Sequence, residues 1–357
     1  MSENHSHLWP GVPLALGAAA LFGASAPLSK LLIGSVDPWL LAGILYLGAG
    51  LGLAAIHWGR PLLGLSNIEA PLRGPDMPWL AAVIVFGGML GPIFLMFGLS
   101  RTSAASGSLL LNLESLATMA IAWVVFRENV DRRLLLGAAA IVAGAVLLSW
   151  NGQALNLDIG ALFIAAACLC WGIDNNLTRK LSSADPVQIA MLKGLLAGST
   201  NLAIALGLGA GLPSATIVAA GAITGFLGVG ISLVMFMLAL RHLGAARTGA
   251  YFSLAPFIGA VLALLLFREN PSLQLLAAGL LMGFGLWLHL SERHDHWHVH
   301  EALEHDHAHT HDDHHQHTHD GPSDEPHSHH HRHEPLRHKH PHYPDLHHRH
   351  SHENAAE

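Results

Sequence analysis

Residues 238–270 read LALRHLGAARTGAYFSLAPFIGAVLALLLFREN, and the last four letters of this stretch occur twice in the chain. The two copies of FREN, at Phe126–Asn129 and Phe267–Asn270, lie 141 residues apart. The similarity extends around them, because LSRTSAASG precedes the first copy as LRHLGAART precedes the second, and a glycine-rich apolar stretch follows each. The chain therefore contains an internal repeat, and this repeat decides its fold.

The composition of the chain is that of a membrane protein. It is 51% hydrophobic and only 12% charged, whereas soluble domains carry about 25% charged residues. Apolar stretches of about 20 residues, the length of a helix that crosses a bilayer, alternate with short polar breaks. We therefore expect an all-α polytopic membrane protein with ten transmembrane helices. They lie near residues 11–32, 39–57, 79–99, 104–125, 134–150, 158–178, 187–208, 215–240, 246–267 and 273–290.

The repeat divides these ten segments into two units of five helices, residues 11–150 and 158–290. The openings of the units also match, since LFGASAPLSK in the first and CWGIDNNLTRK in the second are each followed by an Asp-Pro pair. A unit with an odd number of spans leaves the next unit to enter the membrane from the opposite side. The sequence thus predicts an inverted repeat, as in many secondary transporters, which bind substrate near the midplane between the halves. A duplication that serves stability alone is the alternative.

The distribution of Lys and Arg orients the chain, because cytoplasmic loops collect these residues. If the short N-terminus, residues 1–10, is cytoplasmic, ten basic residues lie in inside loops and three in outside loops. The inside set is Arg60, Arg73, Arg127, Arg132, Arg133, Arg179, Lys180, Arg241, Arg247 and Arg293, and the outside set is Lys30, Arg101 and Arg268. We therefore expect a multi-pass protein of the cytoplasmic membrane with both termini in the cytoplasm.

The paired units and the FREN regions resemble the EamA-type members of the drug/metabolite transporter superfamily over residues 10–290. Residues 238–270 are similar to the family's eighth and ninth helices, with Pro256 midway along the ninth. The resemblance implies the fold of two five-helix units and a carrier, in a family that moves amino acids, nucleosides, drugs or sugar phosphates. One position departs from the pattern. The fourth helix often carries a proline equivalent to Pro256, and this chain has Ser115 there, preceded by Glu114.

Glu114 lies near the middle of the predicted fourth helix, in LLLNLESLATM, with Asn112 and Thr118 close to it. A charge at the bilayer centre costs from about 3 to more than about 10 kcal/mol, so such a residue is a candidate that faces a cavity. Glu114 and Thr118 are four residues apart and share a helix face. We expect the carboxyl group to exchange a proton, which would couple transport to a proton gradient, or to bind a cationic substrate group. A structural glutamate with satisfied hydrogen bonds is the alternative.

Asp174 and Lys193 lie in the predicted sixth and seventh helices, which are antiparallel neighbours. Each residue is a similar number of positions from the loop that joins these helices, and a rise of about 1.5 Å per residue places both at one depth. We therefore expect an ion pair, which serves either structure alone or gating and substrate binding. Asn175 adds a donor and an acceptor beside the pair. Trp171 is a candidate to line the pocket, although aromatic residues of membrane helices are more often anchors.

The segment 294–357 differs from the rest of the chain, because it holds 24 of the 29 histidines and few apolar residues. Such a composition cannot bury enough surface to fold, so we expect a disordered cytoplasmic tail. Its His-x-His spacing would let neighbouring imidazoles bind one Zn²⁺, Ni²⁺, Co²⁺ or Cu²⁺ ion. The candidate metal ligands are His305, His307, His309, His311, His314, His315, His317 and His319. A low-complexity tail without a metal function is the alternative.

The leading hypothesis is a secondary active transporter that exports a small organic metabolite or drug-like solute by alternating access, with a proton gradient as a candidate energy source. A divalent metal-ion exporter whose tail captures the metal is a second hypothesis, and a membrane-anchored metal buffer or sensor is a third. No G-x-x-x-x-G-K-[ST] motif occurs, so we expect no ATP partner. We also expect no catalysis, no required cofactor and no nucleic-acid partner. The expected partners are the lipid bilayer, a small-molecule substrate and, on the tail, divalent metal ions.

Overall fold

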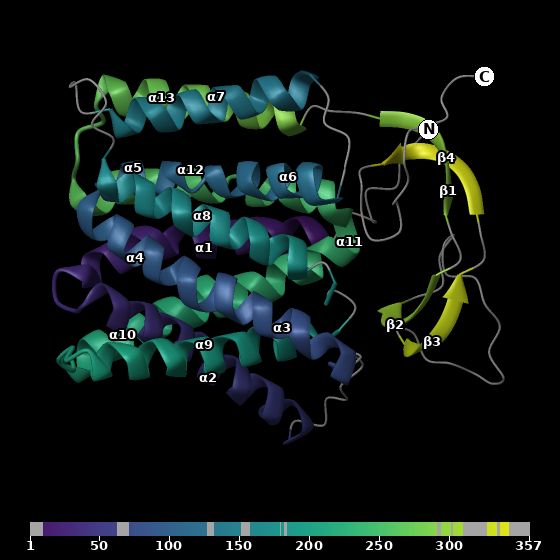
Figure 1. The fold of residues 1–357 in the computed structure, drawn as a ribbon, viewed down its shortest axis with the longest axis horizontal. Helices are drawn as coiled ribbons and strands as arrows, with labels where there is room; N and C mark the ends of the chain where they lie inside the picture. The colour runs from purple at the N-terminus through teal and green to yellow at the C-terminus, as the bar shows by residue number, and fades with distance from the viewer. Residues whose placement is uncertain are drawn as a thin grey trace.

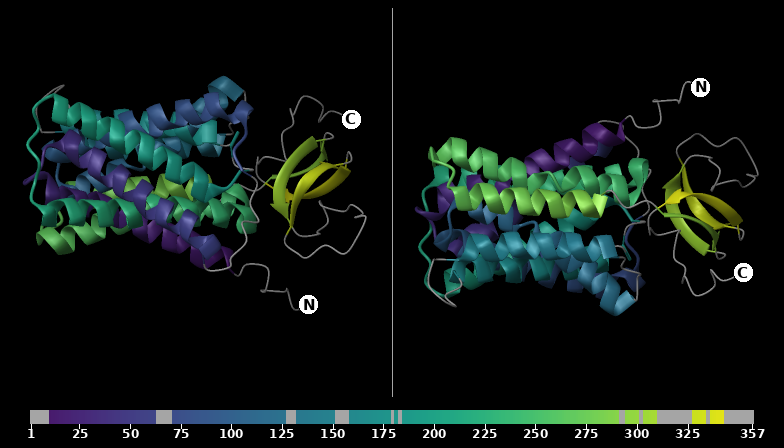
Figure 2. Two further views of the ribbon diagram at one scale, coloured as in Figure 1. Left: turned by 90° about the horizontal axis from the view of Figure 1, so that it is seen from below. Right: turned by 90° about the horizontal axis from the view of Figure 1, so that it is seen from above.

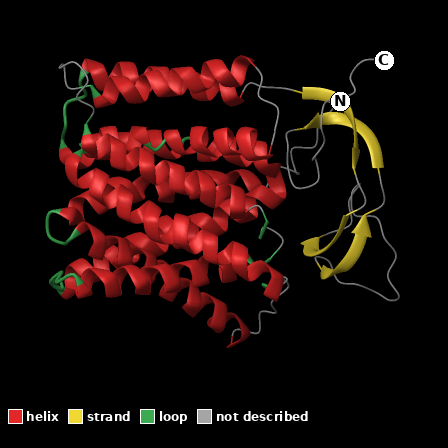
Figure 3. Ribbon diagram, in the orientation of Figure 1, coloured by secondary structure: helices red, strands yellow, loops and turns green. Residues whose placement is uncertain are grey.

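The computed structural model describes residues 10–62, 71–126, 132–150, 158–178, 180–181, 184–290, 294–300, 303–309, 327–333 and 336–342. In this part of the chain, residues 10–290 form a bundle of helices, and four short strands follow (Figure 1, Figure 3). The first repeat contains α1 (Gly11–Ile33), α2 (Pro38–Leu62), the turn η2 (Gly74–Asp76), α3 (Met77–Val83), η3 (Ile84–Leu90), α4 (Gly91–Arg101), α5 (Ala104–Leu110), α6 (Leu113–Phe126) and α7 (Arg132–Ser149). The second contains α8 (Ile159–Thr178), α9 (Pro186–Gly207), α10 (Ala215–Gly225), η4 (Phe226–Ile231), α11 (Ser232–Phe252), α12 (Ala255–Phe267) and α13 (Leu273–Leu290).

The described helices account for ten transmembrane spans. Nine stretches are long and apolar enough to cross a membrane, and Leu273–Leu288 of α13 is a shorter apolar helix. The prediction of ten helices in two five-helix repeats is thereby confirmed. The third span begins at Gly74, earlier than expected, because the Asp76 carboxylate accepts a hydrogen bond of 2.8 Å from the backbone N–H of Arg73 and starts the helix there. α11 covers both the end of the eighth span and the start of the ninth.

The third helix of each repeat contains a π-helical segment, η3 in the first and η4 in the second. The FREN spacing of 141 residues places the equivalent of η3 at η4. Both segments, IVFGGML and FLGVGI, are rich in glycine. Glycine has no side chain that would hinder the wider π-helical turn. π-helical turns inside α-helices are frequent at functional sites. The middle of the third and eighth spans is therefore a candidate region for the functional site.

The fourth helix of each repeat is broken at an equivalent place, between α5 and α6 and between α11 and α12. In the second repeat the break precedes Pro256, which has no backbone N–H to continue the helix. In the first repeat Ser115 replaces that proline. There, side chains donate hydrogen bonds to the backbone carbonyl groups at the break. Ser115 Oγ donates to Asn112 O at 2.8 Å, and Asn112 Nδ2 donates to Leu109 O at 2.8 Å. The departure from the family pattern therefore changes the chemistry of the break and leaves its position unchanged.

The first helix of each repeat packs against helices of the other repeat. α1 contacts η4, α11 and α12 of the second repeat, and α8 contacts α3, η3, α4 and α6 of the first (Figure 1, Figure 2). Two groups of helices result, each with members from both repeats. We call them the α1 group (α1, η4, α11 and α12) and the α8 group (α3, η3, α4, α6 and α8).

Two pairs of equivalent helices, α2 with α9 and α7 with α13, join the repeats on opposite sides of the bundle (Figure 1). A Cβ at Gly144 on α7 would lie 2.7 Å from Cγ of Met282, and a Cβ at Gly285 on α13 would lie 2.9 Å from Cγ1 of Ile141. The FREN spacing makes Gly285 the equivalent of Gly144, and Met282 the equivalent of Ile141. Such a reciprocal contact is what two units related by an approximate two-fold axis produce. Small residues let these membrane helices approach closely.

The tail contains two antiparallel strand pairs in the described residues, β1 (His294–His300) with β4 (Leu336–His342) and β2 (Leu303–His309) with β3 (His327–His333). This differs from the disordered chain that the composition of residues 294–357 predicts. His alternates with other residues at the two-residue period of a strand, so this segment is able to form paired strands. A sheet of two strands is at best marginally stable alone in water.

Candidate functional site

Asp174 on α8 and Lys193 on α9 form an ion pair inside the bundle. Only 5% of Asp174 and 6% of Lys193 is exposed. The second carboxylate oxygen of Asp174 accepts a hydrogen bond of 3.2 Å from Thr178 Oγ1. The ion pair expected from the matching depths of the two residues is confirmed. Because each charge neutralises the other, the pair reduces the cost of placing either in the membrane.

The ion pair packs directly on the backbone of η3. A Cβ at Gly87 would overlap the carboxylate of Asp174 and lie 2.6 Å from Nζ of Lys193. Gly87 therefore has to be a glycine for α8 and α9 to bring their charges together against the third span.

The carbonyl group of Gly87 in η3 binds side chains of two other helices. It accepts a hydrogen bond of 2.8 Å from the hydroxyl of Tyr46 on α2 and one of 3.1 Å from Nε1 of Trp171 on α8. Both donors are buried. Trp171 thus shares its acceptor with Tyr46, a residue that the sequence analysis did not single out.

The backbone of η3 explains why this carbonyl needs side-chain donors. The N–H of Gly91 bonds to Phe86 O, one position further back than in an α-helix. Pro92, which would be the next donor for Gly87 O, has no N–H. The sequence Gly-Gly at 87–88 followed by Gly91-Pro92 was the signal that could have pointed to an open carbonyl group here.

Glu114 lies in the first turn of α6, just after the break of the fourth helix, and is partly buried. Its carboxylate oxygen Oε1 accepts a hydrogen bond of 3.0 Å from Asn175 Nδ2 on α8. The same amide nitrogen lies 3.2 Å from Thr118 Oγ1, which donates to Glu114 O at 2.9 Å. The structure therefore brings Glu114, Thr118 and Asn175 together, and the positive end of the α6 dipole favours a carboxylate at this position.

Asn176 fixes α8 to α6 beside this group. Its Nδ2 donates to Thr118 O at 3.0 Å and to Gly172 O at 2.8 Å, and its Oδ1 has no hydrogen-bond partner in the described part of the chain. Glu114 also interacts electrostatically with Asp174 and Lys193, so we group the ion pair and the Glu114 contact together. We call this group the polar cluster: Glu114, Thr118, Asp174, Asn175 and Lys193.

Asn112 does not join the polar cluster as predicted. Its side-chain nitrogen donates to Leu109 O at 2.8 Å and lies 3.9 Å from the sulfur of Met282 on α13. The residue is buried and stabilises the break between α5 and α6. Asn112 therefore supports the shape of the fourth helix, on the side that faces α13.

A chain of aromatic rings runs from Trp171 on α8 into the α1 group. Trp171 contacts Phe22 on α1 with ring centroids 6.1 Å apart. Phe22 in turn contacts Phe252 at 5.3 Å, and Phe252 contacts Phe236 at 4.7 Å. Aromatic rings thus connect α8 to α1 and α11.

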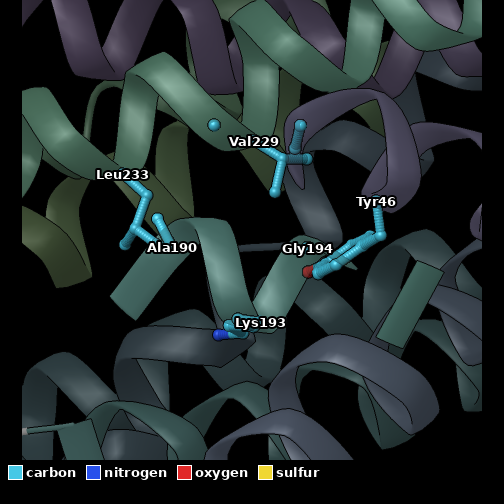
Figure 4. Close-up of a pocket in the computed structure, with 8 residues that line it drawn as sticks. Tyr46, Ala190, Lys193, Gly194, Val229 and Leu233 are labelled. Carbon is cyan, nitrogen blue, oxygen red and sulfur yellow. The ribbon is translucent and has the colours of Figure 1, made fainter. Parts of the chain in front are cut away.

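A small pocket lies between α9 and η4 and is shown in Figure 4. Lys193 and Tyr46 line it on one side, and Val229 and Leu233 line it on the other (Figure 4). The remaining lining residues are Ala49, Ala190, Gly194 and Gly230. The stem of Lys193 therefore faces this pocket while its ammonium group pairs with Asp174.

The predicted metal ligands fall on the tail. His305, His307 and His309 lie in β2, whose backbone register sets them opposite His331, His329 and His327 of β3. His311, His314, His315, His317 and His319 lie outside the described residues. Among the residues that the structure describes, no three His, Cys, Asp or Glu side chains gather as a metal site would require.

Known proteins resemble this chain in sequence and in fold. The EamA-like transporter family matches residues 9–150 and 158–291. An uncharacterized transporter of Methanothermobacter thermautotrophicus is 28% identical over 296 residues, 79% of this chain and 86% of that protein. A probable 4-amino-4-deoxy-L-arabinose-phosphoundecaprenol flippase subunit, ArnE of Pseudomonas aeruginosa, is 38% identical over 112 residues, 30% of this chain and 92% of its own. A crystal structure with a TM-score of 0.58 and 21% identity covers 78% of this chain and 94% of its own, and shows the same fold.

Proposed function

The chain belongs to the EamA-like transporter family, and from this premise we propose that it is a secondary active transporter that exports a small organic solute by alternating access. The observation that carries the proposal is the polar cluster. Charged and polar side chains of α6, α8 and α9 meet where the two inverted repeats contact each other. Inverted-repeat transporters bind substrate at such a place, near the midplane.

The packing of the first helices supports a specific form of the movement. The α1 group and the α8 group each contain helices of both repeats, so we propose that these two groups, and not the two halves of the sequence, tilt against each other. The glycine-lined contacts of α2 with α9 and of α7 with α13 would remain as the joints. The site near Glu114 would then face one side of the membrane and the other in turn.

Glu114 is the group that we propose exchanges a proton during this cycle. Its carboxylate is held by the neutral donor of Asn175, while Asp174 is already paired with Lys193. A proton on Glu114 would alternate with the substrate, which would couple export to the proton gradient. The positions of Lys and Arg support placing both termini in the cytoplasm.

Export can be tested without knowledge of the substrate. Cells that express the chain, the Glu114→Gln variant or the Glu269→Gln variant are compared by untargeted mass spectrometry of cells and medium. Glu269 follows α12 outside the apolar spans and serves as the matched control. We expect to find solutes that are exported by cells expressing the unchanged chain or Glu269→Gln. The same solutes should remain inside cells that express Glu114→Gln. Full export by Glu114→Gln would show that the site is placed wrongly.

Metal handling by the tail is a second candidate function. The backbone register that sets His305, His307 and His309 opposite three histidines of β3 supports it. We propose that the tail binds Zn²⁺, Ni²⁺, Co²⁺ or Cu²⁺ at the cytoplasmic face, as a store, a sensor or a source of exported metal. Removal of residues 294–357 tests this. If the shortened chain still exports organic solutes while the cells tolerate less metal, the tail and the carrier act separately. If removal of the tail abolishes metal efflux through the membrane part, a metal exporter is favoured.

A further inference from the structure

Glu114 is the one ionisable group of the polar cluster that has no oppositely charged partner within the cluster. Asp174 and Lys193 neutralise each other. The partners of the Glu114 side chain in the described residues are neutral, since Asn175 supplies an amide donor and no ion pair there includes Glu114. An ionised carboxylate in this place has a large desolvation cost that a cation would offset. When Glu114 is ionised, the cluster thus has one negative charge in excess.

The other half of the molecule shows that helix packing does not require this charge. The FREN spacing makes Ala255 the equivalent of Glu114, and the matched openings make Ala26 the equivalent of Asn175. In that half α1 packs on α12, with a Cβ at Gly23 lying 3.2 Å from Cα of Ala255. Alanine and glycine are therefore sufficient for the same contact. The hydrogen-bonded glutamate and asparagine are present in one half only, which indicates a role in binding.

Aromatic rings begin one helical turn from Asn175, the residue that binds Glu114. Trp171 and Asn175 are four residues apart on α8 and therefore share one face of that helix. Asn175 on this face holds Glu114, and Trp171 contacts Phe22, which leads to Phe252. Aromatic faces attract cations and repel anions, so the rings and the carboxylate favour the same sign of charge.

From these observations we propose that the substrate is a small organic cation, an amine or ammonium compound with an apolar or aromatic part, whose charge pairs with Glu114. The proposal rests on the transport function given above. Anionic substrates such as sugar phosphates would meet repulsion from Glu114 and from the rings. A metal ion would need several oxygen ligands, and one oxygen of Glu114 already accepts from an amide nitrogen.

Three compounds that each carry one benzene ring and differ in charge test the sign. Benzyltrimethylammonium, benzyl alcohol and benzoate are titrated by calorimetry into the full chain in lipid nanodiscs, with empty nanodiscs as the blank. We expect the cation to bind at least about tenfold more tightly than benzyl alcohol, a difference that one partly desolvated charge pair readily supplies. Benzoate should not bind. Equal or tighter binding of benzyl alcohol or benzoate, or no binding of any of the three, overturns the proposal.

Variants connect this binding to Glu114. Glu114→Gln should weaken cation binding about tenfold or more, Glu114→Asp should keep the preference for the cation, and the control Glu269→Gln should bind as the unchanged chain does. Undiminished cation binding by Glu114→Gln overturns the proposal. If benzyl alcohol is preferred while Glu114→Gln has lost export, only the substrate class is wrong. If export is unaffected by Glu114→Gln while cation binding depends on Glu114, the proposed transport site is wrong and the cation site stands.

Discussion

Phe22 and Trp171 occupy equivalent positions in the two repeats, and their rings meet edge to face with planes at 72°. Two residues related by an approximate two-fold axis can touch only where that axis passes between them. The contact therefore marks the centre of the molecule, where side chains of the first helices of both repeats meet. It also joins the α1 group to the α8 group, so tilting of these groups would change this contact directly.

Substitutions of Trp171 should separate the ring contact from the hydrogen bond to Gly87. Trp171→Phe keeps a ring against Phe22 and removes the Nε1 donor, while Tyr46 still donates to Gly87 O. We expect a loss of about 1 kcal/mol in the free energy of unfolding. Trp171→Ala removes the ring as well and should cost about 3–5 kcal/mol. Denaturant unfolding of the purified protein in detergent checks this, and equal losses for both variants would contradict it.

A side chain at Gly87 should disturb the ion pair. The Cβ of Gly87→Ala would overlap Asp174, and overpacking of this kind typically costs about 1–3 kcal/mol. Gly59→Ala on α2 is the matched control, because nothing lies within 4 Å of a Cβ at that position. We expect a lower melting temperature for Gly87→Ala and little change for Gly59→Ala. Similar melting temperatures for both variants would mean that the contact between η3 and the ion pair is loose.

The ion pair of Asp174 and Lys193 allows a double-mutant cycle. Asp174→Asn or Lys193→Met alone leaves one buried charge without its partner and should cost about 3–5 kcal/mol. The double variant removes both charges and should recover most of this loss. Export by the stable double variant then decides the role of the pair. Normal export identifies it as structural, and absent export identifies it as part of the transport cycle.

Protons should compete with an organic cation for Glu114. Only the ionised carboxylate attracts the cation, so binding of benzyltrimethylammonium should weaken as the pH falls through the range in which Glu114 takes up its proton, by up to about tenfold per pH unit. Calorimetry at a series of pH values measures the slope. Glu114→Gln has no proton to exchange at this position and should give a flat profile. An equally steep profile for that variant would assign the competition to another group.

The sequence predicts the spans well because hydropathy and length act locally. The Asp174–Lys193 pair could also be predicted, since α8 and α9 are adjacent in the chain and their depths follow from helix rise. The contact of Asn175 with Glu114 has no such local signal, because it depends on α8 packing against helices of the other repeat. Tyr46 was missed for the same reason. Its partner is a carbonyl group that only the π-helical turn and Pro92 leave open.

Asn112 shows the opposite error. Its place two residues before Glu114 in the sequence suggested a shared site, but Asn112 lies inside the helix break and its amide contacts α13 instead. The expected proline at Ser115 would have signalled this break. Hydrogen bonds of Ser115 and Asn112 to backbone carbonyls produce it without the proline, and such bonds are hard to recognise in a sequence of small polar residues.

The exchange of first helices between the repeats also has a consequence for synthesis of the protein. α1 enters the membrane before its partners η4, α11 and α12, which follow about 200 residues later. Until then, the faces of α1 that these helices cover are open to lipid or to the insertion machinery. Neither repeat can complete its own packing as it emerges from the ribosome. Assembly must therefore wait for the second repeat, and the long separation of contacting segments should make it slow.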